Sequence, residues 1–226
     1  MRVVVFLSQK GGSGKSTLAC ATAVAAQLDG HRVALVDLDA QGSTASWVDA
    51  RNKLRASMLP DKAPPEIPLR KVGASRIGAW FKEARGRNVG DVLVIIDTAG
   101  TTSEDVAEAL RNADAVIIPV QPSPQDLRAL APTLRQVREH ALGRFAFVLS
   151  RASHLQLREN AEIVAVLERH APVVATVTDR IEFKRAIGLG YGPHETSASS
   201  KAAAEVDALW EHVKQRLGKS DAQAKA

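Results

Sequence analysis

The chain of 226 residues lacks the features that define several protein classes. Its one cysteine, Cys20, cannot form a disulfide framework and is expected to be a small buried side chain in a helix. No run of eighteen apolar residues occurs, so no transmembrane helix is expected. The amino-terminal residues enter a strand pattern directly, so no signal peptide is expected either. These absences favour a cytoplasmic globular protein.

The composition is that of an ordinary domain with a mildly basic charge. The net charge is +5 and the isoelectric point is near 9.6, which permits contact with nucleic acid without demonstrating it. The length fits one domain with a full core, and the sequence contains no internal repeat. We expect a single domain over residues 1–217 and a polar, disordered tail over residues 218–226.

The most specific motif is Gln-Lys-Gly-Gly-Ser-Gly-Lys-Ser-Thr at residues 9–17. It follows an apolar strand at residues 2–8 and precedes a helix at residues 15–29, which is the context of a Walker A loop. Glycines allow backbone N–H groups to cradle phosphates at the positive end of the helix dipole. Lys15 should reach the β- and γ-phosphates, and the Ser16 hydroxyl should ligate Mg²⁺. The expected phosphate-binding residues are Gly11, Gly12, Ser13, Gly14, Lys15, Ser16 and Thr17.

Carboxylates follow two further buried strands. Asp37 ends one apolar run, with Asp39 two residues later, and Asp97 ends another in a Walker B pattern. The carboxyl ends of parallel strands meet at the ligand-binding edge of a sheet, so we expect Asp97 to hold Mg²⁺. Asp39 can orient or deprotonate the attacking water, and a Gly100 N–H can sense the γ-phosphate. A strand-end cap for Asp37 and a plain turn role for Asp39 are the alternatives.

The remaining segments alternate between strand and helix patterns, which predicts an α/β fold with a doubly wound, mostly parallel sheet. Together with the Walker A loop, this indicates the P-loop NTPase fold. Further strands are expected at residues 32–37, 69–72, 91–97, 114–120, 145–149 and 172–177. Further helices are expected from residue 43, at 74–87 and 103–112, after the proline-rich turn at 121–126, and at 157–170 and 197–217. Pro132 is expected to kink the helix after that turn or to mark its restart.

A lysine stands at position 10, and Gln9 occupies the place of the first glycine of an ordinary Walker A loop. This arrangement resembles the deviant loop, K-G-G-x-x-G-K-[ST], of the ParA/MinD family of ATPases. Residues 37–41 are similar to the family's D-x-D-P-Q segment, with Ala40 in place of the proline. Residues 180–186 resemble its R-x-x-[FY]-x-x-A segment. The resemblance runs over nearly the whole chain.

The resemblance implies roles for individual residues. A homodimer would enclose ATP, with Lys10 reaching the partner's nucleotide, Asp39 hydrolytic and Asp37 supporting the magnesium shell. The turn with Pro122 would lie near the adenine–ribose half or the dimer face, and Arg151 loosely matches an adenine-contacting position. The expected catalytic residues are Lys10, Lys15 and Asp39.

The resemblance also bears on the substrate and the partners. ATP is favoured because no Asn-Lys-x-Asp guanine motif occurs, although residues 97–100 resemble the D-x-x-G of G-proteins. The implied function is slow, Mg²⁺-dependent ATP hydrolysis in plasmid or chromosome partitioning on the nucleoid. The dimer would bind non-specific DNA and would be stimulated by a ParB-like or ribbon–helix–helix adaptor at a centromere. The expected DNA-binding residues are Arg180, Lys184 and Arg185; a second basic set is Arg135, Arg138, Arg144, Arg151 and Arg158.

Other functions share the same ATPase core. A ParA-like ATPase can position another cargo, such as a chemoreceptor cluster or a conjugation or cellulose-synthesis complex, and the sequence does not separate these roles. A MinD-like regulator needs bulky apolar residues in a carboxy-terminal amphipathic helix, which residues 219–226 lack, so no membrane partner is expected. A nitrogenase-reductase-like protein needs cysteines at the dimer face, and the single Cys20 is not at such a position, so this function is not expected. Either basic set can also be a solvated helix face.

Overall fold

The structure is a computed structural model that describes residues 1–72, 75–87 and 90–224, with side chains up to residue 218. Its described residues form one seven-stranded sheet in which every neighbouring pair is parallel. The strands are short runs rich in β-branched residues, typical of a sheet covered on both faces. They are β1 (Arg2–Phe6), β2 (Arg32–Asp37), β3 (Leu69–Lys71), β4 (Val92–Asp97), β5 (Ala115–Val120), β6 (Phe145–Ala152) and β7 (Val173–Thr178).

The strand order is β3-β2-β4-β1-β5-β6-β7. Strand β1 therefore lies in the middle, between β4 and β5, and the chain winds outward from it in both directions. The carboxyl ends of β1, β2 and β4 lie next to one another, and Asp37 and Asp97 are direct neighbours across β2 and β4. The topology thus brings the first loop and both strand-end carboxylates to one edge, where open α/β sheets bind ligands.

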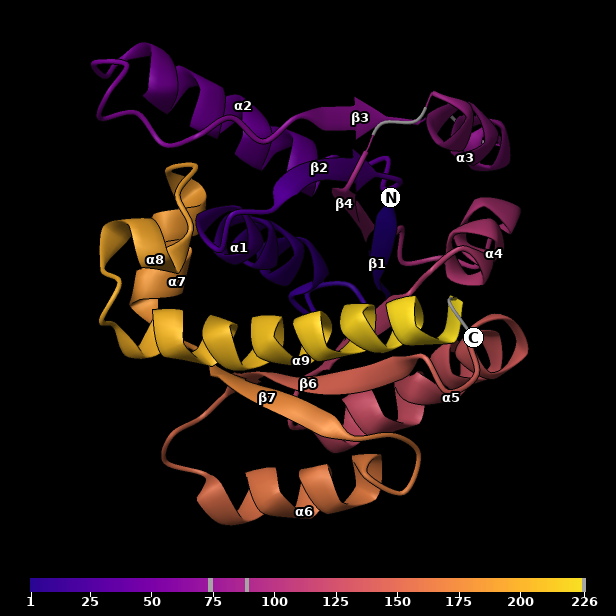
Figure 1. Cartoon of the computed structure of the whole chain (residues 1–226). Helices are drawn as coiled ribbons and strands as arrows, with labels where there is room; N and C mark the ends of the chain where they lie inside the picture. Colours follow the sequence, from indigo (N-terminus) through magenta and orange to yellow (C-terminus); the bar gives the residue numbers. More distant parts are fainter. Residues whose placement is uncertain (73–74, 88–89, 225–226) are drawn as a thin grey trace.

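Helices cover both faces of the sheet (Figure 1). Helices α1, α2, α7 and α9 bury apolar side chains with one face, and α3, α4, α5 and α6 with the other. The helices are α1 (Lys15–Leu28), α2 (Ser43–Ala56), α3 (Ile77–Gly86), α4 (Glu104–Arg111), α5 (Pro124–His140), α6 (Leu157–Leu167), α7 (Ile181–Gly188), α8 (Pro193–Thr196) and α9 (Lys201–Ala224). This arrangement confirms the predicted α/β fold with a doubly wound sheet.

Several boundaries differ from the sequence prediction. Strand β6 continues to Ala152, and α9 continues past Leu217 to Ala224, where an unstructured tail was expected. Helix α5 runs through Pro132 as one helix of 17 residues, without the expected restart. Helix α3 begins at Ile77, whereas its predicted first residue, Ala74, lies outside the described residues. Of the helices that the structure describes, none has the length and apolarity needed to span a membrane.

Candidate nucleotide-binding site

The loop between β1 and α1 is shaped by glycines and held from both sides. Gly14 has φ +95°, a conformation that favours glycine, and its carbonyl accepts the first helical hydrogen bond of α1 from Leu18 N–H at 2.9 Å. The Ser150 hydroxyl donates to the Ser13 carbonyl at 2.6 Å, and the Gln121 amide donates to the Gly12 carbonyl at 2.6 Å. The loop carbonyls are thus bonded to β6 and to the turn after β5, and its amides remain available for phosphate.

Lys15, the first residue of α1, is only 8% exposed. Among the described residues, none forms a hydrogen bond or an ion pair with its ammonium group. The Asp97 carboxylate is close enough for an electrostatic attraction to Lys15, but a nearly buried ammonium that makes no hydrogen bond remains suited to a bound anion. The predicted phosphate-binding role of Lys15 agrees with this environment.

Two carboxylates lie beneath the loop, at the ends of β2 and β4. Asp97 is fully buried and accepts a hydrogen bond from the Thr44 hydroxyl at 2.7 Å. Burial raises the pKa of Asp97 to about 6, while the side chains of Ser16 and Thr44 act in the opposite direction. Burial also raises the pKa of Asp37, which accepts hydrogen bonds from the N–H groups of Asp39 and Ala45.

These carboxylates fit a magnesium site of the kind expected with a nucleotide. The Asp97 Oδ1 atom is buried without a hydrogen-bond partner, and Ser16 is close enough to lower the pKa of this carboxyl group. Across the described ranges, no group of three or more His, Cys, Asp or Glu side chains is placed to hold a metal. Mg²⁺ bound with a nucleotide takes most of its ligands from phosphates and water, so Ser16, Asp37 and Asp97 are the residues that would hold it.

The loop lines a cavity of about 650 Å³. Asp39 lies on its wall, half-buried, and its carboxylate accepts a hydrogen bond from the Gln41 N–H at 2.9 Å. Arg151 lines the cavity as well, with φ +53° and its guanidinium 4.0 Å from Asp179. Of the predicted site residues, those that share this cavity are Gly11, Gly12, Ser13, Gly14, Lys15, Ser16, Thr17, Asp39, Arg151, Arg180 and Lys184.

Two residues predicted to bind DNA therefore lie at the nucleotide cavity. The Arg180 guanidinium donates to Glu205 at 2.9 and 3.1 Å, and the Lys184 ammonium donates to Asp179 at 3.2 Å. Arg185, the third of the set, is exposed and is not part of the cavity wall. Each of the first two thus has an acidic partner within its own chain.

The other predicted residues lie around the cavity. Pro122 belongs to the turn whose Gln121 contacts the phosphate loop, so the turn is adjacent although Pro122 itself does not line the cavity. Gly100 packs against the backbone of Gln9, where an added Cβ would lie 3.4 Å from the Gln9 carbonyl oxygen. The close approach ties the turn after β4 to the start of the phosphate loop.

Lys10 projects away from the cavity to the start of α5. Its ammonium is hydrogen-bonded to the carboxylate of Asp126, which is 5% exposed and also bonds the Ser123 hydroxyl. Asp126 is 116 residues away in the sequence, so no local pattern indicates this pair. Sequence reasoning also missed Thr44 in the first turn of α2, Ser150 within β6 and Gln121 directly after β5.

The comparisons with known proteins agree with this geometry. Residues 4–191 match the family described as the CobQ/CobB/MinD/ParA nucleotide binding domain. The chain is 34% identical over 140 residues to a "Maintenance of carboxysome distribution protein A" of Gloeobacter kilaueensis, covering 60% of this chain and 56% of that protein. It is 32% identical to a "Protein ParA" of Rhizobium radiobacter, covering 62% and 57%. The alignments thus span little more than half the length of these two relatives.

Solved structures share the fold over almost the whole chain. The MinC:MinD cell division protein complex of Aquifex aeolicus matches with a TM-score of 0.73 and 17% identity, over 95% of this chain and 96% of that one. A putative plasmid partition protein of Borrelia burgdorferi, bound to AMPPNP, matches with a TM-score of 0.68 and 18% identity, over 97% and 99%. With the family match over most of its length and the loop, carboxylates and fold described above, the chain belongs to the CobQ/CobB/MinD/ParA family of nucleotide-binding domains.

Proposed function

We propose that this protein is a Mg²⁺-dependent ATPase that switches between nucleotide states in the cavity beside Lys15. The observation that carries the proposal is the nearly buried Lys15 ammonium, which makes no hydrogen bond or ion pair with the described residues, at the mouth of a glycine loop. The loop amides and this ammonium would bind the phosphates. Mg²⁺ would neutralise phosphate charge when bound, held by Ser16 with Asp37 and Asp97 beneath it.

Asp39 is the group proposed to act on the attacking water. It is the carboxylate on the cavity wall, whereas Asp37 and Asp97 lie under the loop. Its Oδ1 is held by the Gln41 N–H, which fixes the side chain and leaves the second oxygen to accept a proton or orient water. Slow hydrolysis without a partner follows from the family resemblance and is part of the proposal.

The proposed ATP state is a homodimer in which Lys10 contacts the partner's nucleotide. Lys10 lies on the outer side of the loop rather than in its own cavity, so its ammonium does not serve its own phosphates. Its present ion pair with Asp126 would have to open before it bridges two protomers. ATP-dependent dimerisation would therefore be coupled to release of this lysine.

The cellular role that we propose is partitioning of plasmid or chromosomal DNA, with non-specific DNA bound in the ATP state and an adaptor at the centromere. Proteins named for plasmid and chromosome partition are among the relatives. Arg185 is exposed, and Lys184 is exposed although paired with Asp179, so these two carry the proposed DNA contact. Arg180 is held by Glu205 and would contribute less.

Positioning of a protein cargo is the second candidate. It is favoured by the 34% identity to a protein named for carboxysome distribution. The ATP switch would be the same in this role, and only the adaptor that links the ATPase to its cargo would differ. Both candidates place the ATP-bound dimer on the nucleoid, so DNA binding tests what they share.

The test is binding of the Asp39→Ala variant to random-sequence duplex DNA, with ATP, with ADP and without nucleotide, across a salt series. We expect the variant to bind DNA with ATP but not with ADP or without nucleotide. The affinity for DNA should fall steeply as the salt concentration rises, because contacts with DNA phosphates release counterions. Asp49→Ala, which changes an exposed aspartate of α2, should hydrolyse ATP normally and so serves as the control.

Two results would count against the proposal. ATP hydrolysis by Asp39→Ala at the wild-type rate would remove Asp39 from its proposed role. DNA binding that is absent in every nucleotide state would overturn the nucleoid role and leave only the ATP switch.

Substituting Arg185 by Glu should lower the salt dependence of binding by about one phosphate contact if this helix faces DNA.

A further inference from the structure

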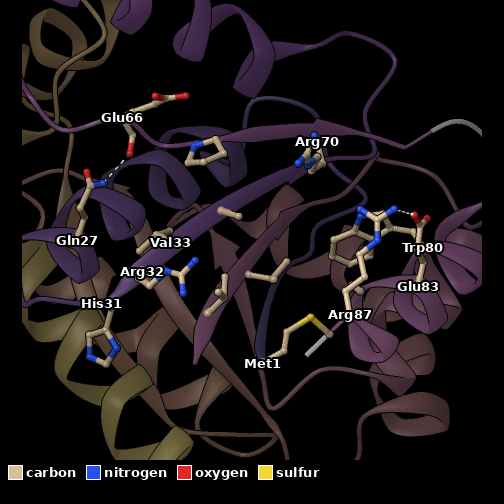
Figure 2. Close-up of a pocket in the computed structure, with 15 residues that line it drawn as sticks. Met1, Gln27, His31, Arg32, Val33, Glu66, Arg70, Trp80, Glu83 and Arg87 are labelled. Atoms are coloured by element: carbon tan, nitrogen blue, oxygen red, sulfur yellow. Dashed lines mark hydrogen bonds and ion pairs between the residues drawn. The ribbon is translucent and has the colours of Figure 1, made fainter. Parts of the chain in front are cut away.

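A second cavity, of about 630 Å³, lies on the face of the sheet that α3 covers incompletely (Figure 2). Its floor consists of small apolar side chains of β2 and β4, including Ala34, Val92 and Val94. Trp80 of α3 and Arg87, which directly follows this helix, form one wall, and the segment entering β3 forms the other. Ala34 and Val92 belong to the first half of their strands, so this groove lies toward the amino ends, away from the phosphate loop.

The groove borders an unpaired stretch of the β2 backbone, where Val33 is 5% exposed. Strand β3 pairs only with Leu35–Asp37, and the first bond on this side runs from Leu35 N–H to the Pro68 carbonyl at 2.8 Å. Because backbone groups alternate between the two sides of a strand, the N–H and C=O of Val33 point to the same side. Pro68 has no N–H to donate there, and the Glu66 carbonyl accepts from Gln27 instead, at 2.7 Å. Within the described ranges, Val33 has no partner on that side.

Two arginines beside this edge have no acidic partner. Arg32 and Arg70 are exposed, and no described residue forms a hydrogen bond or an ion pair with either guanidinium. Figure 2 shows Arg32 extending into the groove. The acidic side chains of the groove are both paired already, Glu83 with Arg87 and Glu66 with Arg55. The charge left over in the groove is therefore positive.

The spacing of these arginines matches an extended chain. Arg70 is the neighbour of Val36, which lies four residues after Arg32, and residues an even number apart point to the same face of a sheet. Four residues of strand cover about 13 Å. Two carboxylates four residues apart on an extended peptide therefore span the same length and face the same way.

We propose that this groove binds a short, extended, acidic segment of a partner protein. Such a segment would hydrogen-bond to the Val33 backbone at one end only, because β3 occupies the edge of β2 from Leu35 onward. From there it would cross the groove and direct two carboxylates to Arg32 and Arg70. Its apolar side chains would cover Ala34 and Val92 beside Trp80. The groove involves no residue of the nucleotide site, so this inference goes beyond the proposed ATPase and stands independently of it.

The test uses a fluorescein-labelled peptide, acetyl-Glu-Val-Thr-Val-Glu-amide, titrated with the full chain in about 0.15 M salt, where general attraction is screened. We expect saturable binding of this peptide. A peptide with Gln in place of both Glu residues should bind at least about tenfold more weakly. Arg32→Glu and Arg70→Glu should each reduce binding to a similar extent. Arg169→Glu changes an exposed arginine outside the groove and should bind like the wild type. Hydrogen exchange at the Val33 amide should slow in the complex.

The outcomes separate the possibilities. Equal binding of the Glu and Gln peptides, or equal loss with Arg169→Glu, would show general charge attraction and overturn the proposal. Absence of saturable binding to the wild type would overturn it as well. Binding without a change at Val33 would refute the backbone contact at Val33. ATP binding by each variant reports that the fold is intact, and it also separates failure of this groove from failure of the proposed ATPase.

Discussion

At the scale of single residues, Asp97 illustrates the cost of assembling a charged site in a buried place. The carboxylate lies at the end of β4 with no exposed surface, next to Asp37 and under the phosphate loop. Its pKa is raised from 3.8 to about 6 by burial. The folded chain thus holds the proton more tightly than the unfolded chain, and the ionised carboxylate opposes folding until a cation arrives.

This shift predicts a pH-dependent stability. The contribution of Asp97 to the free energy of unfolding is full below about pH 4 and is lost as the pH rises through about 6. Without nucleotide and with EDTA, Asp97→Asn should be more stable than the wild type at pH 7.5, by up to about 3 kcal/mol for a shift of about two units. At pH 5 the difference should shrink. Urea unfolding at both pH values measures it, with the exposed Asp61→Asn variant as the control.

Addition of Mg²⁺ and ATP should reverse the order. The wild type should gain stability because the ligand binds only the folded state, whereas Asp97→Asn should gain much less. A variant that is less stable than the wild type at pH 7.5 without ligand would contradict the argument that the buried charge is costly.

At the scale of elements, Arg51 joins parts of the fold that are distant in sequence. This arginine of α2 has no exposed surface. Its guanidinium donates to both carboxylate oxygens of Glu195 in α8, at 2.8 and 2.9 Å, and to the carbonyls of Gly190 and Pro65. Gly190 has φ +82°, and an added Cβ would lie 2.3 Å from the Arg51 backbone nitrogen. This contact fixes α8 and the end of α7, and α7 forms part of the nucleotide cavity wall.

Removal of this arginine should destabilise the protein strongly. Arg51→Ala removes the cation that pairs with the Glu195 carboxylate and the donor to two carbonyls, and breaking a buried pair of this kind costs about 3–5 kcal/mol. We expect the midpoint of urea unfolding to fall accordingly and ATP affinity to weaken, because α7 loses its support. Arg158→Ala, which breaks an exposed pair with Glu162 at 3.1 Å, is the matched control and should unfold like the wild type. A small effect of Arg51→Ala would mean that α8 is held by packing alone.

The elements were largely predictable because their signals are local. The strand before the phosphate loop, the helix after it and the carboxylates at strand ends are each encoded within about ten residues, and all lie where the pattern placed them. The ion pairs that tie these elements together are not local: Arg51 and Glu195 are 144 residues apart, and Lys10 and Asp126 are 116 apart. Such pairs follow from topology, which a single sequence does not contain. For the same reason the sequence did not reveal that Arg180 faces Glu205.

At the scale of the whole molecule, the ion pair between Lys10 and Asp126 links the monomer to the proposed dimer. Lys10 is one-third exposed. Asp126 lies in the first turn of α5, and its N–H donates to the side chain of Ser123, the N-cap residue of this helix. A lysine that is bonded within its own chain is not available to a partner. The ion pair therefore favours the monomer, and the gain from contact with a second nucleotide must exceed its loss.

The expected consequence is opposite for the two partners of the pair. In an Asp39→Ala background that retains ATP, Lys10→Ala should bind ATP but dimerise at least about tenfold more weakly, a loss of about 1.4 kcal/mol. Asp126→Asn keeps an acceptor for the Ser123 hydroxyl but frees Lys10, so its dimer should form at lower protein concentration than that of the parent. Sedimentation equilibrium with ATP measures both, and Lys82→Ala, an exposed lysine of α3, is the control. An unchanged dimer in Lys10→Ala would exclude the bridging role. Weaker dimerisation in Asp126→Asn would mean instead that the pair positions Lys10 for its partner, because release and positioning predict opposite signs.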